Sequence, residues 1–420
     1  MSPELASWLA FIERQHSSTI ALGLDRIAKI LPRIGRPKVA PIITVGGTNG
    51  KGSTCAMLEA MLVAAGFRVG LYTSPHLLRY NERVRIDRQE ASDDILVKAF
   101  AAVEAARGDI PLTYFEFGTL AAWIAFADAA LDVMILEVGL GGRLDAVNVF
   151  DPDCAIVTTV DLDHMDYLGD TREQIGWEKA HIFRAGTPAL CADPNPPATL
   201  IEYARSIGAN LRLFGRDFGV EAHEIQWTFW SERNRRGGLA YPALRGSTQL
   251  RNAASAIAAL ESLHERLPVP AGAIRTGLAT VALPGRFQVL AGAPTIILDV
   301  GHNPEAARVL AANLADMPHA SHTIAICGVL RDKDAEGICR ALGASIDEWF
   351  AVGLPGERGR SAAEFEAAVR AAGLKAPVFQ YADVRDALAA AKSAAGADDR
   401  IVVFGSFLTV AAAMTVLNAH

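Results

Sequence analysis

A glycine-rich stretch, VGGTNGKGST at residues 45–54, constrains the fold of this chain more than any other feature. It follows the apolar run PIITVGG (residues 41–47), typical of a buried strand, and precedes STCAMLEAMLVAAG (residues 53–66), which has helical composition. Glycines between a strand and a helix let backbone N–H groups turn toward an anion, and the helix N-terminus adds partial positive charge. The sequence therefore predicts a phosphate-binding loop in an α/β fold, with Lys51 supplying a full charge.

The spelling of this loop differs from the common phosphate loop, G-x-x-x-x-G-K-[ST], in which the hydroxyl residue directly follows the lysine. Here Gly52 follows Lys51, and the hydroxyls come only at Ser53 and Thr54. Because the strand and helix context is retained, we interpret the shifted hydroxyl as the mark of a distinct nucleotide-binding family.

Length and composition limit the classes of protein that are possible. A chain of 420 residues exceeds one ordinary core and predicts two domains, and 51% apolar with 21% charged residues is globular composition. With 40 basic against 47 acidic residues the net charge is −7, which argues against a general nucleic-acid binder. No apolar run reaches the roughly 18 residues of a membrane span, and the N-terminal segment lacks a basic signal-peptide start. Five cysteines without a C-x-x-C pair favour reduced thiols and a cytoplasmic location.

Apolar, β-rich runs alternate with Ala-rich helical stretches, which is the pattern of a mostly parallel sheet covered on both faces. Residues 211–250 are less regular and predict a small antiparallel patch. We expect an N-terminal ATP-binding domain over 1–285, a linker over 286–294, and a smaller doubly wound, Rossmann-like domain over 295–420, with a ligand cleft between the two domains. Further apolar runs at 132–140 and 154–160 predict strands, and 295–304 opens a second strand–loop–helix series that continues with the runs 322–330 and 400–407.

Several polar side chains stand inside or just after these apolar runs. Glu137 interrupts one strand, where a carboxylate is costly unless it is paired or bound to a metal, so both a magnesium role and a buried ion pair are open. Ser74 of LYTSPHL is, on its own, an ordinary turn residue. His164 of TTVDLDHMDYLG lies in a cation-friendly cluster but is also a common kind of loop histidine. On its own, Lys179 of WEKAHIFR is an ordinary surface lysine.

Seven motifs occur in order over nearly the whole chain: GTNGKGS, TSPHL, EVGLGGRLDAVN, DHMDYLG, EKAHIFR, LPGRFQ and LDVGHNP. Together they resemble the folylpolyglutamate synthase and dihydrofolate synthase family of the Mur ligase superfamily. The resemblance implies a Mur-type α/β fold and an ATP-dependent amide ligase of folate biosynthesis and one-carbon metabolism. It also implies that the glycine loop is this superfamily's own phosphate loop.

The resemblance implies a nucleotide site and a metal site. In the metal site two Mg²⁺ ions are expected, and Lys179 would carry a CO₂-derived carbamate whose oxygens suit this cation. Lys51, Lys179 and His164 would be catalytic. The expected metal ligands are Ser74, Glu137, His164 and Lys179. The expected ATP contacts are Asn49, Gly50, Lys51, Gly52, Ser53, Asn252, Arg286, Asp299 and His302.

The resemblance further implies a pterin site and three small-molecule substrates: dihydropteroate, reduced folates and L-glutamate. An acyl phosphate formed from ATP would be attacked by the amine of glutamate. Two positions depart from the family pattern, since Ala21 replaces an aspartate and His181 replaces a glycine. The expected pterin contacts are Thr19, Ile20, Ala21, Thr113, Tyr114, Phe115, Glu116, Leu144, Asp145 and Ala146.

Four alternatives stay open on the sequence. They are a folylpolyglutamate synthase without the first activity, a related ligase acting on peptidoglycan precursors, a nucleotide-binding regulator without ligation, and a structural protein with a glycine turn. The dispersed polar set and the LTYFEFGT stretch (residues 112–119) favour the bifunctional ligase. The resemblance implies a monomer, and the net charge and the lack of a long apolar run favour a chain without a nucleic-acid or membrane partner.

Overall fold

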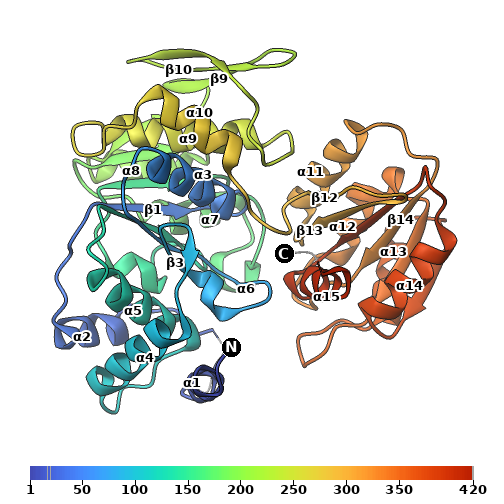
Figure 1. The fold of residues 1–420 in the computed structure, drawn as a ribbon, viewed down its shortest axis with the longest axis horizontal. Coiled ribbons are helices and arrows are strands. Elements are labelled where there is room, and N and C mark those ends of the chain that lie inside the picture. The colour runs from blue at the N-terminus through green and yellow to red at the C-terminus, as the bar shows by residue number, and fades with distance from the viewer. Residues whose placement is uncertain (17, 19, 419–420) are drawn as a thin grey trace. The chain divides into compact units, whose positions relative to one another are not determined.

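The computed structural model describes residues 1–16, 18 and 20–418, and the chain divides into two compact units (Figure 1). Unit 1 comprises residues 1–243 and 250–281, and unit 2 comprises residues 244–249 and 282–420.

Unit 1 is built on an eight-stranded sheet in the order β4-β3-β2-β5-β1-β6-β7-β8. Strands β2, β5, β1, β6, β7 and β8 pair in parallel, and only β3 and β4 at one edge run antiparallel. This confirms the expected parallel α/β sheet. The strands are β1 (Ile42–Gly46), β2 (Val69–Tyr72), β3 (Val84–Ile86), β4 (Gln89–Glu90), β5 (Val133–Glu137), β6 (Cys154–Val157), β7 (Pro188–Cys191) and β8 (Asn210–Leu213).

Helices cover both faces of this sheet, with α3, α9 and α10 on one side and α4 and α5 on the other (Figure 1). Helices α3 and α5 are buried along most of their length because further helices pack over them, α10 on α3 and α4 on α5. The helices are α1 (Pro3–Glu13), α2 (Asp25–Ile34), α3 (Lys51–Ala64), α4 (Asp93–Arg107), α5 (Tyr114–Ala127), α6 (Met165–Leu168), α7 (Arg172–Ala180), α8 (Ala198–Ser206), α9 (Gln249–Ser262) and α10 (Ala271–Thr280), with 3₁₀ turns η1 (Tyr80–Arg83) and η2 (Ala146–Val149).

A second, three-stranded sheet in unit 1 has the order β11-β10-β9 and is antiparallel throughout. It confirms the antiparallel patch expected within residues 211–250. Its strands are β9 (Phe218–Ala222), β10 (Trp227–Ser231) and β11 (Arg235–Leu239), and β11 is an edge strand.

Unit 2 contains a six-stranded sheet in the order β12-β13-β17-β14-β15-β16, parallel except for the pairing of β12 with β13. Residues 288–290, inside the segment expected to be a linker, form the edge strand β12. The strands are β12 (Gln288–Leu290), β13 (Thr295–Asp299), β14 (Thr323–Cys327), β15 (Glu348–Val352), β16 (Val378–Tyr381) and β17 (Arg400–Phe404). The helices are α11 (Pro304–Ala315), α12 (Ala335–Leu342), α13 (Ala362–Ala371), α14 (Val384–Ala394) and α15 (Phe407–Leu417), with a 3₁₀ turn η3 (Gly343–Ser345).

The five cysteines are unpaired and buried, as the sequence predicts. Among the described residues, no helix is long and apolar enough to cross a membrane.

The contact between α10 and α3 gives a test of this packing. At Gly277 an added Cβ would lie 2.6 Å from the backbone of Met61, whereas at Gly272, on the same helix, it would meet no atom within 4 Å. We expect Gly277→Ala to lower the free energy of unfolding by about 2 kcal/mol through overpacking. Gly272→Ala, the matched control, should leave stability equal or slightly higher because alanine favours helix. Urea unfolding followed by circular dichroism measures both, and equal stability of the two variants would contradict the close approach.

Candidate active site

The phosphate loop joins β1 to α3 and takes a shape that only glycine allows at two positions. Gly47 has a φ of 141°, and a Cβ there would lie 1.9 Å from Thr158 Oγ1. Gly50, the N-cap of α3, has a φ of 85° in the left-handed region and offers no side-chain cap. The first amides of α3 are therefore left for a ligand, as in other anion-binding helix N-termini.

Two consecutive threonines after β6 hold the loop in place. The backbone N–H of Thr48 donates to the carbonyl of Thr159 at 2.8 Å, and that of Asn49 donates to Thr159 Oγ1 at 3.0 Å. Thr158 Oγ1 donates to the carbonyl of Asn49 at 2.6 Å. Sequence reasoning missed both threonines, although a Thr-Thr pair at the end of a strand next to a glycine loop is a signal that could have found them.

Three of the expected nucleotide residues meet in this loop. Lys51 Nζ donates to the carbonyls of Gly47 and Thr48, both at 3.1 Å, so its charge lies against the loop backbone. Asn252, buried on α9, approaches Gly50 so closely that a Cβ on the glycine would lie 2.7 Å from its Oδ1. The structure thus brings Asn252 to the loop from a segment remote in the sequence.

Glu137 ends β5 and is buried, with only 3% of the residue exposed. The backbone N–H of Ser74 donates to its Oε2 at 3.1 Å, so these two expected metal ligands are adjacent. Burial raises the pKa of the Cys55 thiol well above its ordinary value; the charge of Glu137 adds to this increase and that of Lys51 opposes it. The Glu137 carboxylate and the Lys51 ammonium therefore both lie close enough to Cys55, a buried residue of α3, to affect the pKa of its thiol.

Lys179 is buried, 3% exposed, on the last turn of α7, so the reading of it as an ordinary surface lysine is wrong. The backbone of Gly142, five residues after Glu137, packs against this turn, since a Cβ on the glycine would lie 3.1 Å from the Cα of Lys179. The N–H of Arg143 donates to the carbonyl of Glu178 at 3.0 Å. These contacts fix the segment of Lys179 against the loop that follows Glu137.

His164 is half-buried and has a φ of 51° at the N-terminus of the one-turn helix α6, with its Nε2 4.0 Å from Asp163 Oδ2. Over the part of the chain that the structure describes, no group of three or more His, Cys, Asp and Glu side chains is arranged to hold a metal ion. The donors at hand include the Glu137 carboxylate and the Ser74 hydroxyl, both of which are oxygen ligands that fit Mg²⁺. An ammonium is no ligand, so Lys179 fits the group only after conversion to a carbamate.

The three segments expected to bind the pterin lie together. Arg26 of α2 donates from Nε to both carboxylate oxygens of Glu116, at 3.0 and 3.1 Å, and from Nη2 to the carbonyl of Ala21. The N–H of Gly23 donates to the carbonyl of Leu144 at 3.1 Å. Thr19 lies outside the described residues. Arg26 was missed by sequence reasoning because a lone arginine on a surface-type helix carries no signal.

Glu116 serves the fold as well as the site. It closes a capping box at the start of α5, where Thr113 N donates to its Oε2 at 2.9 Å and Glu116 N donates to Thr113 Oγ1 at 3.2 Å. With the Arg26 ion pair added, its carboxylate is held by three donors, which are Arg26 Nε, the Thr113 backbone N–H and the Thr113 hydroxyl. Beside it, the ring of Phe115 packs against Gly139, where a Cβ would lie 2.6 Å from the ring, and lies 5.9 Å from the ring of Tyr72.

Asp145 is buried at the N-terminus of η2 and accepts from the backbone N–H of Leu140 at 2.8 Å and of Val147 at 2.9 Å. Burial raises the pKa of its carboxyl to about 7, against the lowering effect of these backbone donors and of Lys51. The charge of Lys51 therefore lowers the pKa of the Asp145 carboxyl as well as that of the Cys55 thiol.

In unit 2, the three expected nucleotide residues gather at the carboxyl end of β13. Asp299 accepts from the N–H of Gly301 at 2.7 Å and of Phe287 at 2.9 Å. Burial raises the pKa of Asp299, and the nearby charges of Arg286 and His302 oppose this increase. The Arg286 guanidinium lies 5.3 Å from the ring of Phe407, and the His302 ring lies 6.3 Å from it. Arg286, Asp299 and His302 thus form one cluster within this unit.

Comparison with known proteins identifies the family of the chain. The Mur ligase middle domain matches residues 45–260, and the Mur ligase, glutamate ligase domain matches residues 285–407. Over 417 residues the chain is 44% identical to the dihydrofolate synthase/folylpolyglutamate synthase of Escherichia coli strain K12, covering 99% of this chain and 96% of that protein.

Solved structures are similar over the full length. E. coli FolC in complex with DHPP and ADP superposes with a TM-score of 0.94 at 44% identity, covering 99% of this chain and 98% of that one. A bifunctional folylpolyglutamate synthase/dihydrofolate synthase with Mn, AMPPNP and L-glutamate bound superposes with a TM-score of 0.91 at 45% identity, covering 100% and 98%.

The fold and the phosphate loop define a Mur-type ligase architecture, which confirms the fold class read from the sequence. Within the Mur ligases, the chain belongs to the dihydrofolate synthase/folylpolyglutamate synthase family.

The raised pKa of Asp145 gives a prediction for stability against pH. A carboxyl whose pKa is raised on folding holds its proton more firmly in the folded chain than in the unfolded one, so ionising it at higher pH costs stability. We expect this contribution to fall as pH rises from about 4, the pKa of an unfolded aspartate, to about 7, the pKa of Asp145 in the folded chain. Asp145→Asn should flatten the pH dependence of the free energy of unfolding over this window.

The matched control is Asp109→Asn, which changes an exposed aspartate in the same unit. Urea unfolding at a series of pH values measures all three proteins. A wild-type slope that persists in Asp145→Asn would contradict the assignment.

Proposed function

We propose that this chain is an ATP-dependent amide ligase that adds L-glutamate to dihydropteroate, giving dihydrofolate, and to reduced folates, extending their glutamate tail. The observation that carries the proposal is the 44% identity over 417 residues with a protein named for both activities. The ligands of similar structures, ADP with DHPP in one and AMPPNP, Mn and L-glutamate in the other, fit the same reaction.

The reaction requires a phosphoryl group to pass from ATP to a substrate carboxylate. We infer that the free amides at the start of α3 and the Lys51 ammonium bind the phosphates and neutralise charge as it develops. Asn49, Gly50, Gly52 and Ser53 would hold the phosphates with them, and Asn252 would contact the nucleotide from α9. The resulting acyl phosphate is attacked by the amine of glutamate, and inorganic phosphate leaves as the amide bond forms.

Metal binding belongs to this proposal. Ser74, Glu137, His164 and a carbamate on Lys179 would hold up to two Mg²⁺ ions. Bound Mg²⁺ would supply charge neutralisation at the transferring phosphoryl group. The carbamate forms when a neutral Lys179 amine attacks CO₂ and loses a proton. The position of the buried Lys179 beside the loop that follows Glu137 supports this assignment.

In unit 2 we propose that the cluster of Arg286, Asp299 and His302 contacts the nucleotide. An arginine fork suits phosphate oxygens, and Asp299, with its two backbone donors, has a fixed orientation for a ligand hydroxyl or metal-bound water.

We assign the pterin to the three linked segments of unit 1. Asp145 with a pKa of about 7 can be present either as an acid or as a carboxylate near neutral pH, so it can donate to or accept from a heterocycle. Phe115 would provide a ring face. Further contacts would come from Thr19, Ile20, Ala21, Thr113, Tyr114, Glu116, Leu144 and Ala146. A cytoplasmic location and a monomeric state remain proposals from the sequence.

A first test compares acceptors. With ATP, Mg²⁺ and glutamate present, we expect ADP release with both dihydropteroate and a reduced folate. The control omits glutamate, which should stop turnover and so exclude a nucleotide switch without ligation. Turnover with the reduced folate alone would reduce the assignment to a folylpolyglutamate synthase. No turnover with either acceptor would overturn it and direct attention to peptidoglycan precursors.

A second test concerns Lys179. We expect Lys179→Ala to lower kcat by on the order of 10²-fold or more, since the anionic ligand is lost from the transition state. The control Lys29→Ala removes an exposed lysine of α2 in the same unit and should leave kcat unchanged. Nuclear magnetic resonance with carbon-13 bicarbonate should detect a carbamate in the wild type and in Lys29→Ala only. Wild-type turnover in Lys179→Ala would exclude the carbamate role.

A further inference from the structure

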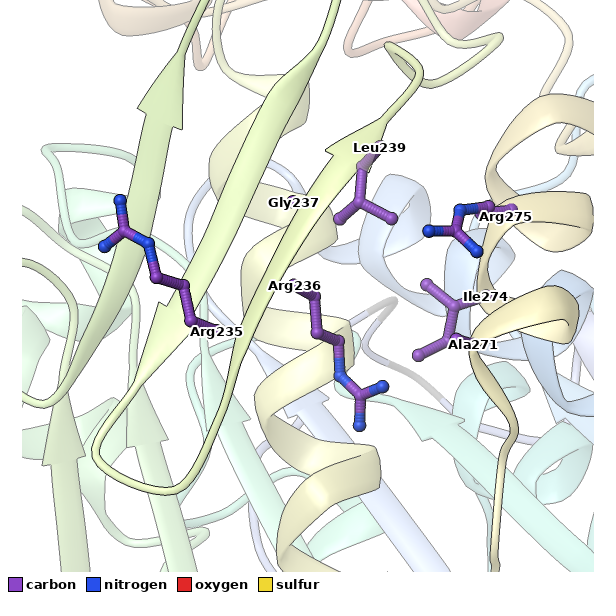
Figure 2. Close-up of a pocket in the computed structure, with 7 residues that line it drawn as sticks. All are labelled: Arg235, Arg236, Gly237, Leu239, Ala271, Ile274 and Arg275. Carbon is purple, nitrogen blue, oxygen red and sulfur yellow. The ribbon is translucent and has the colours of Figure 1, made fainter.

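A polar cavity lies in unit 1, between the edge strand β11 and helix α10 (Figure 2). Its volume is about 270 Å³. The residues that line it, none of them acidic, are Arg235, Arg236, Gly237, Leu239, Ala271, Ile274 and Arg275. None of the motifs assigned to the ligase reaction contributes to it.

Two of the arginines point into the space between strand and helix, one from each wall. Figure 2 shows the guanidinium of Arg236 in the gap beside β11, and that of Arg275 extending from α10 toward the strand. Arg235 lies on the opposite face of the strand, as alternation along a β-strand requires, and forms an ion pair with Glu221. The cavity therefore contains two guanidinium groups, those of Arg236 and Arg275. Arg235 borders the cavity only as part of strand β11.

The charge of Arg236 is incompletely balanced by the protein. Its Nε lies 3.6 Å from Glu261 Oε1, too far for a hydrogen bond, and within the described part of the chain this buried Nε has no hydrogen-bond partner. The same Glu261 carboxylate already accepts from Ser231 Oγ at 2.9 Å and from Asn234 Nδ2 at 2.8 Å. A buried donor left in this way costs free energy that a bound acceptor would recover.

The start of α10 adds to the positive potential. Ala271, its first residue, lines the cavity, and the N-cap Pro270 provides no side-chain hydrogen bond to the first turn. The amides of that turn and the helix dipole favour a negative charge at this end of the cavity.

From these contacts we propose that the cavity between β11 and α10 binds a small polyanion, a molecule with two or more neighbouring phosphate or carboxylate groups. An arginine guanidinium binds either a phosphate or a carboxylate through two parallel hydrogen bonds. Leu239 and Ile274, both buried, provide an apolar wall that suits a compact carbon skeleton as well.

This cavity is distinct from the phosphate loop. Helix α10 packs on α3 through Gly277 and Met61, and Met61 lies ten residues after Lys51. At 1.5 Å per helical residue this contact is about 15 Å from the start of α3. None of the residues that line the cavity belongs to the phosphate loop (residues 45–54), so a ligand there leaves that loop free for nucleotide.

The test is calorimetric titration with inorganic pyrophosphate in one arm and tricarballylate, a tricarboxylate, in the other. The protein is first saturated with ADP in metal-free buffer, so that the phosphate loop is filled and the probe is not chelated. We expect one site for at least one probe, and a weakening of about tenfold in Arg236→Gln and in Arg275→Gln, the loss of one charge-assisted bond each. The arm that binds more tightly identifies the ligand as phosphate-bearing or carboxylate-bearing.

Arg235→Gln is the matched control, because it removes the same charge from the adjacent residue on the opposite face. If the ligand is bound by the arginines inside the cavity and not by overall surface charge, the affinity of Arg235→Gln for the probe should stay within about twofold of the wild type. No binding to the wild type, or equal losses in Arg235→Gln and Arg275→Gln, would overturn the proposal.

Arg275→Gln keeps the test valid if Arg236→Gln weakens the fold through Glu261, because Arg275 is exposed. The titration measures binding and does not depend on ligase activity. Its failure can therefore be distinguished from a failure of the proposed function.

Discussion

The site depends on a backbone approach at Gly47, where the chain leaves β1 and passes directly over the side chain of Thr158. A Cβ on Gly47 would lie 1.9 Å from Thr158 Oγ1, a distance that no side chain can occupy. This contact lets Thr158 and Thr159 hold the loop through side chain and backbone. The amides of α3 and Lys51 are then fixed before a nucleotide arrives, which is what electrostatic preorganisation requires.

A second constraint, the ion pair between Arg26 and Glu116, joins parts of unit 1 that the sequence separates by 90 residues. Glu116 closes the capping box at the start of α5. Arg26 holds the segment that precedes α2 by donating a hydrogen bond to the carbonyl of Ala21. Breaking a largely buried pair leaves a charge without its partner, at a cost of about 3 kcal/mol or more. One of the expected pterin segments begins α5. The arrangement of these segments therefore depends on the stability of α5.

Much of this could be predicted from the sequence, and the failures share a cause. Strand and helix patterns gave the parallel sheets because burial on both faces makes strands continuously apolar, as at β5. Family motifs gave the residues of the phosphate loop. Reasoning from local context failed at Lys179, Arg26 and the threonines after β6, because their burial and partners come from segments remote in the sequence. Local composition also could not assign residues 288–290 to a strand, since β12 exists only through its pairing with β13.

The two departures from the family pattern have a physical explanation in the backbone. His181 has φ −69° and ψ 0°, right-handed values that any residue adopts, so a glycine is not required there. Its ring stacks on Tyr203 at 3.9 Å and lies 4.2 Å from the ring of Trp177, and its Nδ1 is 2.7 Å from the Trp177 carbonyl. The side chain therefore packs between α7, the helix that carries Lys179, and Tyr203 of α8.

Ala21 is held in a different way, because Arg26 binds its carbonyl rather than its side chain. Any residue provides that carbonyl, so replacing an aspartate by alanine removes one polar group from the expected pterin site without releasing the segment. The consequence is confined to substrate contact, and the fold of the site does not depend on it.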